Sequence, residues 1–264
     1  MSTRNSQASK AAARERLRVQ REKEAKRAKV RRQLLVGGGV VALLAVAGGV
    51  TVAVNAANKP SYWSAAAKDT LVKPANTTGT NGTTVIIGDA NNKNTVEEYE
   101  DMRCPVCAAY EQAAGAAVLK DAEDGKYQIS YTFGTFLDAG QGGSGSKKAL
   151  SALGAALNVS KDAFTAYHTL LYSKNVHPDE TVDTFNSADK LISLAQQVPA
   201  LKNNTKFSNA VKNGTFDKWA LTMSDKFDAS GVTATPTVKV NGKTVTVTGL
   251  TSAQVQSAFA ADLT

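Results

Sequence analysis

The sequence predicts an α/β domain with an all-helical insertion, preceded by a single N-terminal transmembrane helix. Three observations support this fold class. An uncharged apolar run, Leu34–Val54, comes before the globular part. A strand–helix–strand pattern follows over residues 95–133, and strand patterns return only near residue 237. We therefore expect one folded domain over residues 82–264, with a helical insertion at about 140–230.

The apolar run is long enough to cross a bilayer, because a membrane-spanning helix needs about 20 residues. We assign residues 1–33 to a basic cytoplasmic tail, 34–55 to the transmembrane helix and 56–81 to an extracytoplasmic linker. Small residues after the run, such as Ala56 and Ala57, also fit a signal-peptide cleavage site. The apolar core of a cleaved signal is shorter, about 7–15 residues, so we expect an uncleaved anchor.

The net charge of +8 is concentrated in the tail. The first 32 residues carry 12 Lys and Arg against three Glu, whereas the remainder carries 19 basic and 20 acidic residues. The positive-inside rule then keeps the tail in the cytoplasm, beside the lipid bilayer, and places the domain outside a single-pass cell-membrane anchor. A nearly neutral domain is not typical of nucleic-acid binding, so we expect no nucleic-acid partner.

The first half of the domain reads as a βαβ unit. Two strand patterns, Thr83–Ile87 and Thr95–Tyr99, are joined by a turn-rich segment. An alanine-rich helix starts within Cys104-Pro-Val-Cys107 and ends at Asp124-Gly125. Tyr127–Phe133 then alternates apolar and polar residues, as a half-buried strand does. The two cysteines therefore lie at a strand-to-helix junction.

The second half begins with the insertion, in which apolar residues such as Leu150, Leu153 and Leu157 recur at helical spacing. Thr237–Val240 and Lys243–Val247 flank an Asn-Gly pair, which is a strong signal for a β-hairpin. The stretch that begins at Thr251, Thr-Ser-Ala-Gln, resembles a capping box and predicts a terminal helix.

The only two cysteines, Cys104 and Cys107, leave three interpretations open. A structural disulfide is possible because residues three apart share a helix face, but so small a loop contributes only about 2 kcal/mol. A structural zinc site needs four ligands, and only His168 and His177 are available to complete it. Their separation does not fit the usual pair, and His168 falls on an apolar helical stripe. The third interpretation is a redox pair.

The redox interpretation has a physical basis. Cys104 would lie at a helix N-terminus, where free N–H groups stabilise a thiolate, and Arg103 adds an exposed positive charge beside it. Cys107, one turn deeper, would be the shielded resolving thiol. Glu98, on the preceding strand, is a candidate buried carboxylate that takes the proton of Cys107. The alternative for Glu98 is a solvated acid on an edge strand.

These residues resemble the DsbA-like thioredoxin-fold family. The segment VEEYEDMRCPVC resembles the family's strand and active site, with an acid at Glu98 and the redox pair at Cys104 and Cys107. Further along, GVTATPTVKVNGK resembles its cis-proline loop, with Thr235-Pro236 facing the cysteines. The stretches FLDAGQGGSGSKKALSAL and AYHTLLYS resemble its helical insertion. The resemblance implies a thioredoxin-like fold with a cis peptide bond before Pro236.

Together with the predicted anchor, the resemblance implies a membrane-tethered thiol–disulfide oxidoreductase that exchanges disulfides with exported proteins. We expect the oxidative direction, with a membrane redox partner such as a quinone-linked oxidase that resets the cysteine pair. We expect no cofactor and no metal, because the cysteines themselves carry the electrons. Val106 stands where strongly oxidising members carry histidine, which leaves the direction of electron flow open. The alternatives are a reductase of exported thiols and a non-catalytic binding module with a structural disulfide.

Overall fold

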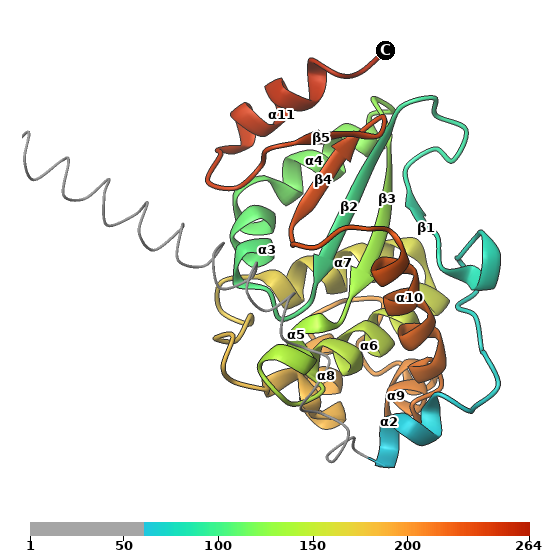
Figure 1. Cartoon of the computed structure of the whole chain (residues 1–264). Helices are drawn as coiled ribbons and strands as arrows, with labels where there is room; N and C mark the ends of the chain where they lie inside the picture. Colours follow the sequence, from blue (N-terminus) through green and yellow to red (C-terminus); the bar gives the residue numbers. More distant parts are fainter. Residues whose placement is uncertain (1–60) are drawn as a thin grey trace, which may run out of the picture. The chain divides into compact units, whose positions relative to one another are not determined.

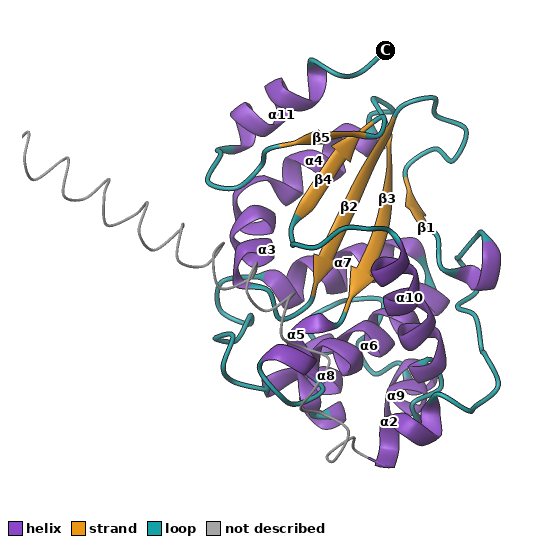
Figure 2. Ribbon diagram, in the orientation of Figure 1, coloured by secondary structure: helices purple, strands orange, loops and turns teal. Residues whose placement is uncertain are grey.

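A five-stranded sheet runs through the part of the chain that the computed structural model describes, residues 61–264 (Figures 1 and 2). The predicted basic tail, the predicted transmembrane helix and residues 56–60 of the predicted linker lie outside the described residues. Within residues 61–264, no helix combines the length and the apolar character that crossing a membrane requires.

The strands are arranged in the order β1-β3-β2-β4-β5. Their bounds are Val85–Ile87 for β1, Thr95–Asp101 for β2, Gln128–Gly134 for β3, Thr237–Val240 for β4 and Lys243–Val245 for β5. Strands β2 and β3 pair in parallel, as a βαβ unit requires, and the other neighbours pair antiparallel. The central strand of the sheet is therefore β2, which leads into the two cysteines.

The helices of the first half and of the C-terminus are α2 (Ser61–Ala66), α3 (Pro105–Tyr110), α4 (Ala116–Glu123) and α11 (Ser252–Ala260). Between α3 and α4 lies a π-helical turn, η2 (Glu111–Gly115). The insertion holds α5 (Phe136–Gly140), α6 (Gly145–Val159), α7 (Lys161–Tyr172), α8 (Ala188–Ala195), α9 (Thr205–Asn213) and α10 (Asp217–Ala229). Two short 3₁₀ turns are η1 (Thr80–Gly82) and η3 (Thr184–Asn186).

Helices cover both faces of the sheet. Successive side chains of β2 point to opposite faces, so they contact different helices. Tyr99 points to one face, where its ring lies 6.2 Å from the ring of Phe227 in α10. Glu98 and Glu100 point to the other face, where they contact Tyr110 of α3 and His168 of α7. The face beneath the cysteines is therefore closed by α3 and α7, as the ribbon shows (Figure 2).

The predicted elements are largely confirmed. The hairpin between β4 and β5 turns at Asn241 and Gly242, both with positive φ, which is the conformation that an Asn-Gly turn favours. The capping box at Thr251 is present, and it opens α11. The segment between β3 and β4 is helical, as predicted for the insertion. One difference is that the helix expected from the cysteines to Asp124 is interrupted by η2.

The predicted linker is corrected in part, because residues 61–81 of it pack on the domain. Trp63 in α2 is only 7% exposed, beside α10, and Asn76 donates a 2.7 Å hydrogen bond to the carbonyl of Leu157. The indole of Trp219 donates a 2.7 Å hydrogen bond to the carbonyl of Gly82. The aromatic and amide side chains of this segment thus find partners on α6 and α10.

Candidate active site

Cys104 and Cys107 lie at the start of α3, directly after β2. Cys104 is the N-cap residue of α3, and its Sγ accepts a 3.4 Å hydrogen bond from the backbone N–H of Cys107. Pro105 occupies the first helical position, where its missing N–H is not needed. Both cysteines are free thiols and both are buried, Cys107 completely. The strand-to-helix junction predicted from the sequence is thus the position of the pair.

The loop before β4 faces the pair. The peptide bond between Thr235 and Pro236 is cis, as the family resemblance implies. The carbonyl of Thr235 lies 3.4 Å from Cys104 Sγ and accepts a hydrogen bond from that thiol. Two segments separated by 131 residues therefore meet at one sulfur atom. The catalytic roles of Thr235 and Pro236 themselves stay predictions.

The two thiols differ in acidity. The hydrogen bond from the Cys107 thiol, followed by interactions with Thr235 and with the Cys107 backbone N–H, lowers the pKa of Cys104 against the opposing effect of burial. Burial raises the pKa of Cys107 well above its usual value, and the hydrogen bond with Cys104, the charge of Cys104 and the charge of Glu100 raise it further. This difference in acidity is the one that a nucleophilic Cys104 and a protonated Cys107 would require, and the two catalytic roles stay predictions.

Arg103 does not have the exposed position that we expected. Its side chain is 1% exposed, and its guanidinium donates hydrogen bonds to Asp138 (3.1 Å) and to the carbonyls of Gly142 (2.7 Å) and Glu180 (3.0 Å). A buried guanidinium needs such partners, because an unpaired buried charge is strongly unfavourable. Arg103 therefore ties the active-site junction to the insertion, and its charge is compensated by Asp138.

The buried carboxylate of Asp101 also fixes this junction. It accepts hydrogen bonds from the backbone N–H of Arg103 (3.0 Å) and of Leu137 (3.1 Å), and from the hydroxyl of Ser146 (2.5 Å). Burial raises the pKa of Asp101 to about 6, while these hydrogen bonds oppose the rise. The end of β2 is thus held to α5 and α6 immediately before the cysteines.

Glu98 is buried on the central strand, which excludes the alternative of a solvated acid on an edge strand. Its carboxylate accepts a 2.7 Å hydrogen bond from the hydroxyl of Tyr110. Burial raises the pKa of Glu98 above its usual value. Its predicted role in proton transfer with Cys107 stays a prediction.

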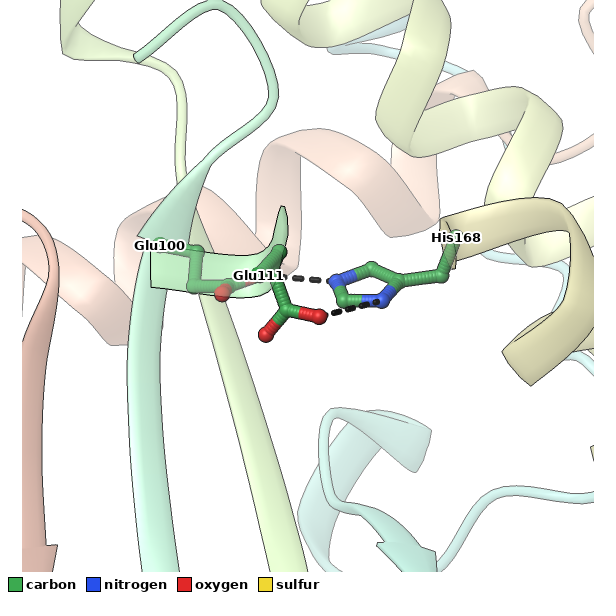
Figure 3. Close-up of side chains that lie close together, drawn as sticks. All are labelled: Glu100, Glu111 and His168. Atoms are coloured by element: carbon green, nitrogen blue, oxygen red, sulfur yellow. Dashed lines mark hydrogen bonds and ion pairs between the residues drawn. The ribbon is translucent and has the colours of Figure 1, made fainter. Parts of the chain in front are cut away.

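Sequence reasoning missed a buried set of three side chains, Glu100, Glu111 and His168 (Figure 3). His168 Nε2 lies 2.8 Å from Glu100 Oε2, and His168 Nδ1 lies 3.9 Å from Glu111 Oε2. His168 is 1% exposed, and its Nδ1 has no hydrogen-bond partner among the described residues. The available signal was Glu100 itself, two residues after Glu98 and so on the same strand face.

The same three side chains each offer a ligand atom, and these atoms lie within 4.8 Å of one another. By spacing they could hold a metal ion. However, the two carboxylates approach opposite nitrogens of one imidazole, and a single ion cannot bind both nitrogens of one ring. The arrangement fits hydrogen-bonded acids and a base better. The other histidine, His177, lies elsewhere, with Nε2 3.2 Å from the carbonyl of Met102.

Comparison with known proteins agrees with this geometry. The sequence model of the family described as Thioredoxin matches residues 80–259. The reduced form of the disulfide bond oxidoreductase DsbG from Mycobacterium tuberculosis is 27% identical, with a TM-score of 0.59 over 69% of this chain and 88% of that chain. Oxidised DsbA from Mycobacterium tuberculosis is 26% identical, with a TM-score of 0.55 over 68% of this chain and 99% of that chain.

A further structure shares the fold at lower identity. Oxidised BdbD from Bacillus subtilis is 21% identical, with a TM-score of 0.57 over 72% of this chain and 98% of that chain. No curated protein sequence matches this chain. The matched region begins at Thr80, so it covers the sheet, both cysteines, the cis-proline loop and the insertion.

Proposed function

Because this chain belongs to the thioredoxin family, and within it to the DsbA-like thiol–disulfide oxidoreductases, we propose that it introduces disulfide bonds into exported proteins from a membrane-tethered position outside the cytoplasm. The observation that carries the proposal is the position of Cys104 Sγ. It lies at the N-terminus of α3 and within hydrogen-bonding distance of both the Cys107 backbone N–H and the Thr235 carbonyl.

The reaction follows from the two different thiols. In the oxidised protein, a client thiolate attacks Cys104 Sγ, the Cys104–Cys107 bond breaks, and Cys107 leaves as a thiolate that takes up a proton. A second client thiolate then attacks the client sulfur of the mixed disulfide and releases the Cys104 thiolate. The client loses two electrons and the cysteine pair gains them. A low Cys104 pKa favours the release step, because a more acidic thiol is a better leaving group.

The oxidative direction is supported by the same feature. Hydrogen bonds that lower the pKa of Cys104 stabilise the reduced form of the pair, and a stabilised reduced form makes a disulfide a stronger oxidant. Val106 is half-buried between the cysteines and offers no donor to the thiolate, which favours a less oxidising pair. The second candidate function is therefore a reductase of exported thiols.

The membrane tether and the redox partner are supported by the sequence. The uncharged run Leu34–Val54 follows a strongly basic tail, as in a single-pass anchor with a cytoplasmic N-terminus. A protein that oxidises its clients must itself be reoxidised, and a quinone-linked oxidase in the same membrane would meet a tethered domain. Proteolysis of the full-length protein in intact cells tests the orientation, since the proposal requires the domain to be cleaved from outside.

The catalytic proposal is tested by mixing the oxidised full-length protein with a reduced peptide that contains two cysteines. The wild-type protein is expected to form the peptide disulfide in a burst of one equivalent, whereas Cys104→Ser forms none. A wild-type protein that is no faster than Cys104→Ser would refute the proposed activity. The reduction potential of the pair then separates the two directions, because values near about −120 mV favour an oxidase and values near about −270 mV favour a reductase.

Replacing Val106 with histidine is expected to make the pair more oxidising. The imidazole would lie beside the Cys104 thiolate and donate a hydrogen bond to it, which stabilises the reduced form. Each tenfold stabilisation raises the reduction potential by about 30 mV, and we expect at least that change from equilibration in glutathione buffers. Val106→Ala, which removes the side chain without adding a donor, is the matched control. An unchanged or lower potential in Val106→His would contradict this account of Val106.

A further inference from the structure

The part of the insertion around α9 carries a concentrated positive charge. The described domain as a whole is slightly acidic, because residues 61–264 contain 18 Lys and Arg against 20 Asp and Glu. Residues 190–216, by contrast, contain four lysines and no acid. Three of them, Lys202, Lys206 and Lys212, lie in α9 or in the turn before it, and all three are exposed. We call these three residues the lysine face.

The fold itself makes little use of the lysine face. Helix α9 turns Phe207 and Val211 inward, and the ring of Phe207 lies 5.6 Å from that of Tyr167. Lys206 and Lys212 are left on the solvent side of the helix. Among residues 61–264, no acid forms an ion pair with any of the three lysines. Their ammonium groups are therefore available to an anionic partner.

The lysine face lies at the end of the domain where the described chain begins. Gly214 ends α9 with a φ of 63°, and a Cβ atom there would come within 2.5 Å of the hydroxyl oxygen of Tyr62 in α2. Lys218, in the first turn of α10, donates a 2.6 Å hydrogen bond to the carbonyl of Ala67. Helix α2 is accordingly drawn beside α9 in Figure 1.

Side-chain contacts fix α2 in this position. The hydroxyl of Tyr62 donates a hydrogen bond to Asp217, and Lys148 Nζ lies 3.3 Å from the same carboxylate. Lys148 Nζ also lies 3.8 Å from the ring centroid of Tyr62 and 5.0 Å from that of Trp63, so it makes cation–π contacts with both rings. Because α2 is fixed to α6 and α10, a force applied to α2 acts on the whole domain.

Only a short stretch of chain separates α2 from the predicted anchor. The predicted transmembrane helix ends at residue 55, and α2 begins at Ser61. The six steps between these residues reach at most about 20 Å, since an extended chain covers about 3.3–3.6 Å per residue. A domain tethered in this way keeps α2, and the lysine face beside it, close to the bilayer. This step rests on the membrane tether of the proposed function.

We propose that the lysine face docks on anionic lipid headgroups of the membrane to which the domain is tethered. Each lysine beside an anionic surface strengthens binding by about fivefold. The tether makes docking an intramolecular event, so a few such contributions suffice. Docking would hold the domain in one orientation and thereby fix the position of Cys104 relative to the membrane, in which the proposed redox partner lies.

The test is the acetylation rate of single lysines in the full-length protein, reconstituted into vesicles and treated with a membrane-impermeant reagent. Mass spectrometry reads each lysine separately. In vesicles of equal parts phosphatidylglycerol and phosphatidylcholine, the lysine face is expected to react at least fivefold more slowly than in phosphatidylcholine alone. Lys93 and Lys174, which are exposed outside α9, should react equally in both. A salt concentration of about 1 M should remove the difference, because it screens exposed charges.

Matched variants test whether the charge itself is the cause. Lys206→Gln/Lys212→Gln is expected to lower the ratio of docked to undocked protein by about 25-fold, at about fivefold for each lysine. Lys202 is the reporter, and its slow acetylation in anionic vesicles should be lost. Lys93→Gln/Lys174→Gln removes the same charge elsewhere on the domain, and Lys202 should stay protected in it. All four positions are exposed, so the circular dichroism spectra should match that of the wild-type protein.

Three results would overturn the inference. They are equal acetylation of the lysine face in the two kinds of vesicle, equal slowing of Lys93 and Lys174, and a protected Lys202 in Lys206→Gln/Lys212→Gln. Slowing that requires an added soluble polyanion would assign the lysine face to a different partner and would also overturn the inference.

Extraction of the vesicles with alkaline carbonate separates this inference from the proposed function. Full-length protein that carbonate removes is not anchored, which would refute the tether and the docking together. Protein that stays in the vesicles without protection of the lysine face refutes the docking alone. The thiol–disulfide activity is measured separately with the dithiol peptide, and neither result changes it.

Discussion

Replacing Cys107 with serine is expected to convert the protein into a covalent trap for its clients. Cys104 has the lowered pKa of a nucleophile, and in the variant its thiolate can still attack a client disulfide: the Cys104–client bond forms, the client disulfide breaks, and the second client sulfur leaves as a thiolate. Cys107, the thiol of this protein that would displace the client from Cys104, is absent, so the adduct persists longer than in the wild-type protein. Non-reducing electrophoresis of cells that express Cys107→Ser should show adducts that dithiothreitol dissolves, and mass spectrometry should place the linkage on Cys104.

The reciprocal variant is the control. Cys104→Ser leaves only Cys107, which is fully buried and has a strongly raised pKa, so few or no adducts are expected. If Cys107→Ser also formed none and merely lost stability, the pair would be a structural disulfide and the domain a binding module. The two variants differ only in which sulfur remains, so the comparison measures the combined effect of the burial and the acidity of the two thiols.

Replacing Asp138 with alanine is expected to lower the free energy of unfolding by about 3–5 kcal/mol, because it leaves the buried guanidinium of Arg103 without its main partner. Asp138 also accepts hydrogen bonds from the backbone N–H groups of Ser146 (2.9 Å) and Lys147 (3.0 Å) at the start of α6. Urea unfolding followed by circular dichroism measures the change.

The matched control is Asp262→Ala, which removes the carboxylate of an ion pair with the exposed Lys243. Exposed pairs contribute little, so we expect a loss below about 1 kcal/mol. Equal losses in Asp138→Ala and Asp262→Ala would show that Arg103 does not depend on its buried partner. Asp183, which lies 3.5 Å from Arg103 and is partly exposed, would then be the compensating acid.

The parts of the fold that could be predicted are those specified by local sequence. The Asn241-Gly242 turn, the capping box at Thr251 and the βαβ unit around Cys104 each depend on residues close together in the chain, and the structure has all three. The cis peptide at Pro236 was predictable only from the family resemblance. Nothing in a Thr-Pro dipeptide alone indicates which isomer the fold selects.

The parts that could not be predicted depend on how the insertion docks. Arg103 looked exposed because a charged residue before a helix usually is, and only the position of Asp138 shows that it is buried. The sequence correctly places His168 on an apolar helical stripe. Its partner Glu100 is 68 residues away in the chain, so no local pattern indicates that the two side chains meet. The π-helical turn that begins at Glu111 likewise has no recognisable pattern in this alanine-rich sequence.

The packing of residues 61–81 on the insertion has a consequence for where the domain can be cut. A recombinant fragment starting at residue 82, the boundary that composition suggests, would discard Trp63 and Asn76 and uncover the surfaces of α10 and α6 that they cover. A fragment starting at residue 61 keeps both, and it keeps the hydroxyl of Tyr62 beside Lys148 and Asp217. The packed domain therefore extends further toward the N-terminus than the region shared with the thioredoxin family.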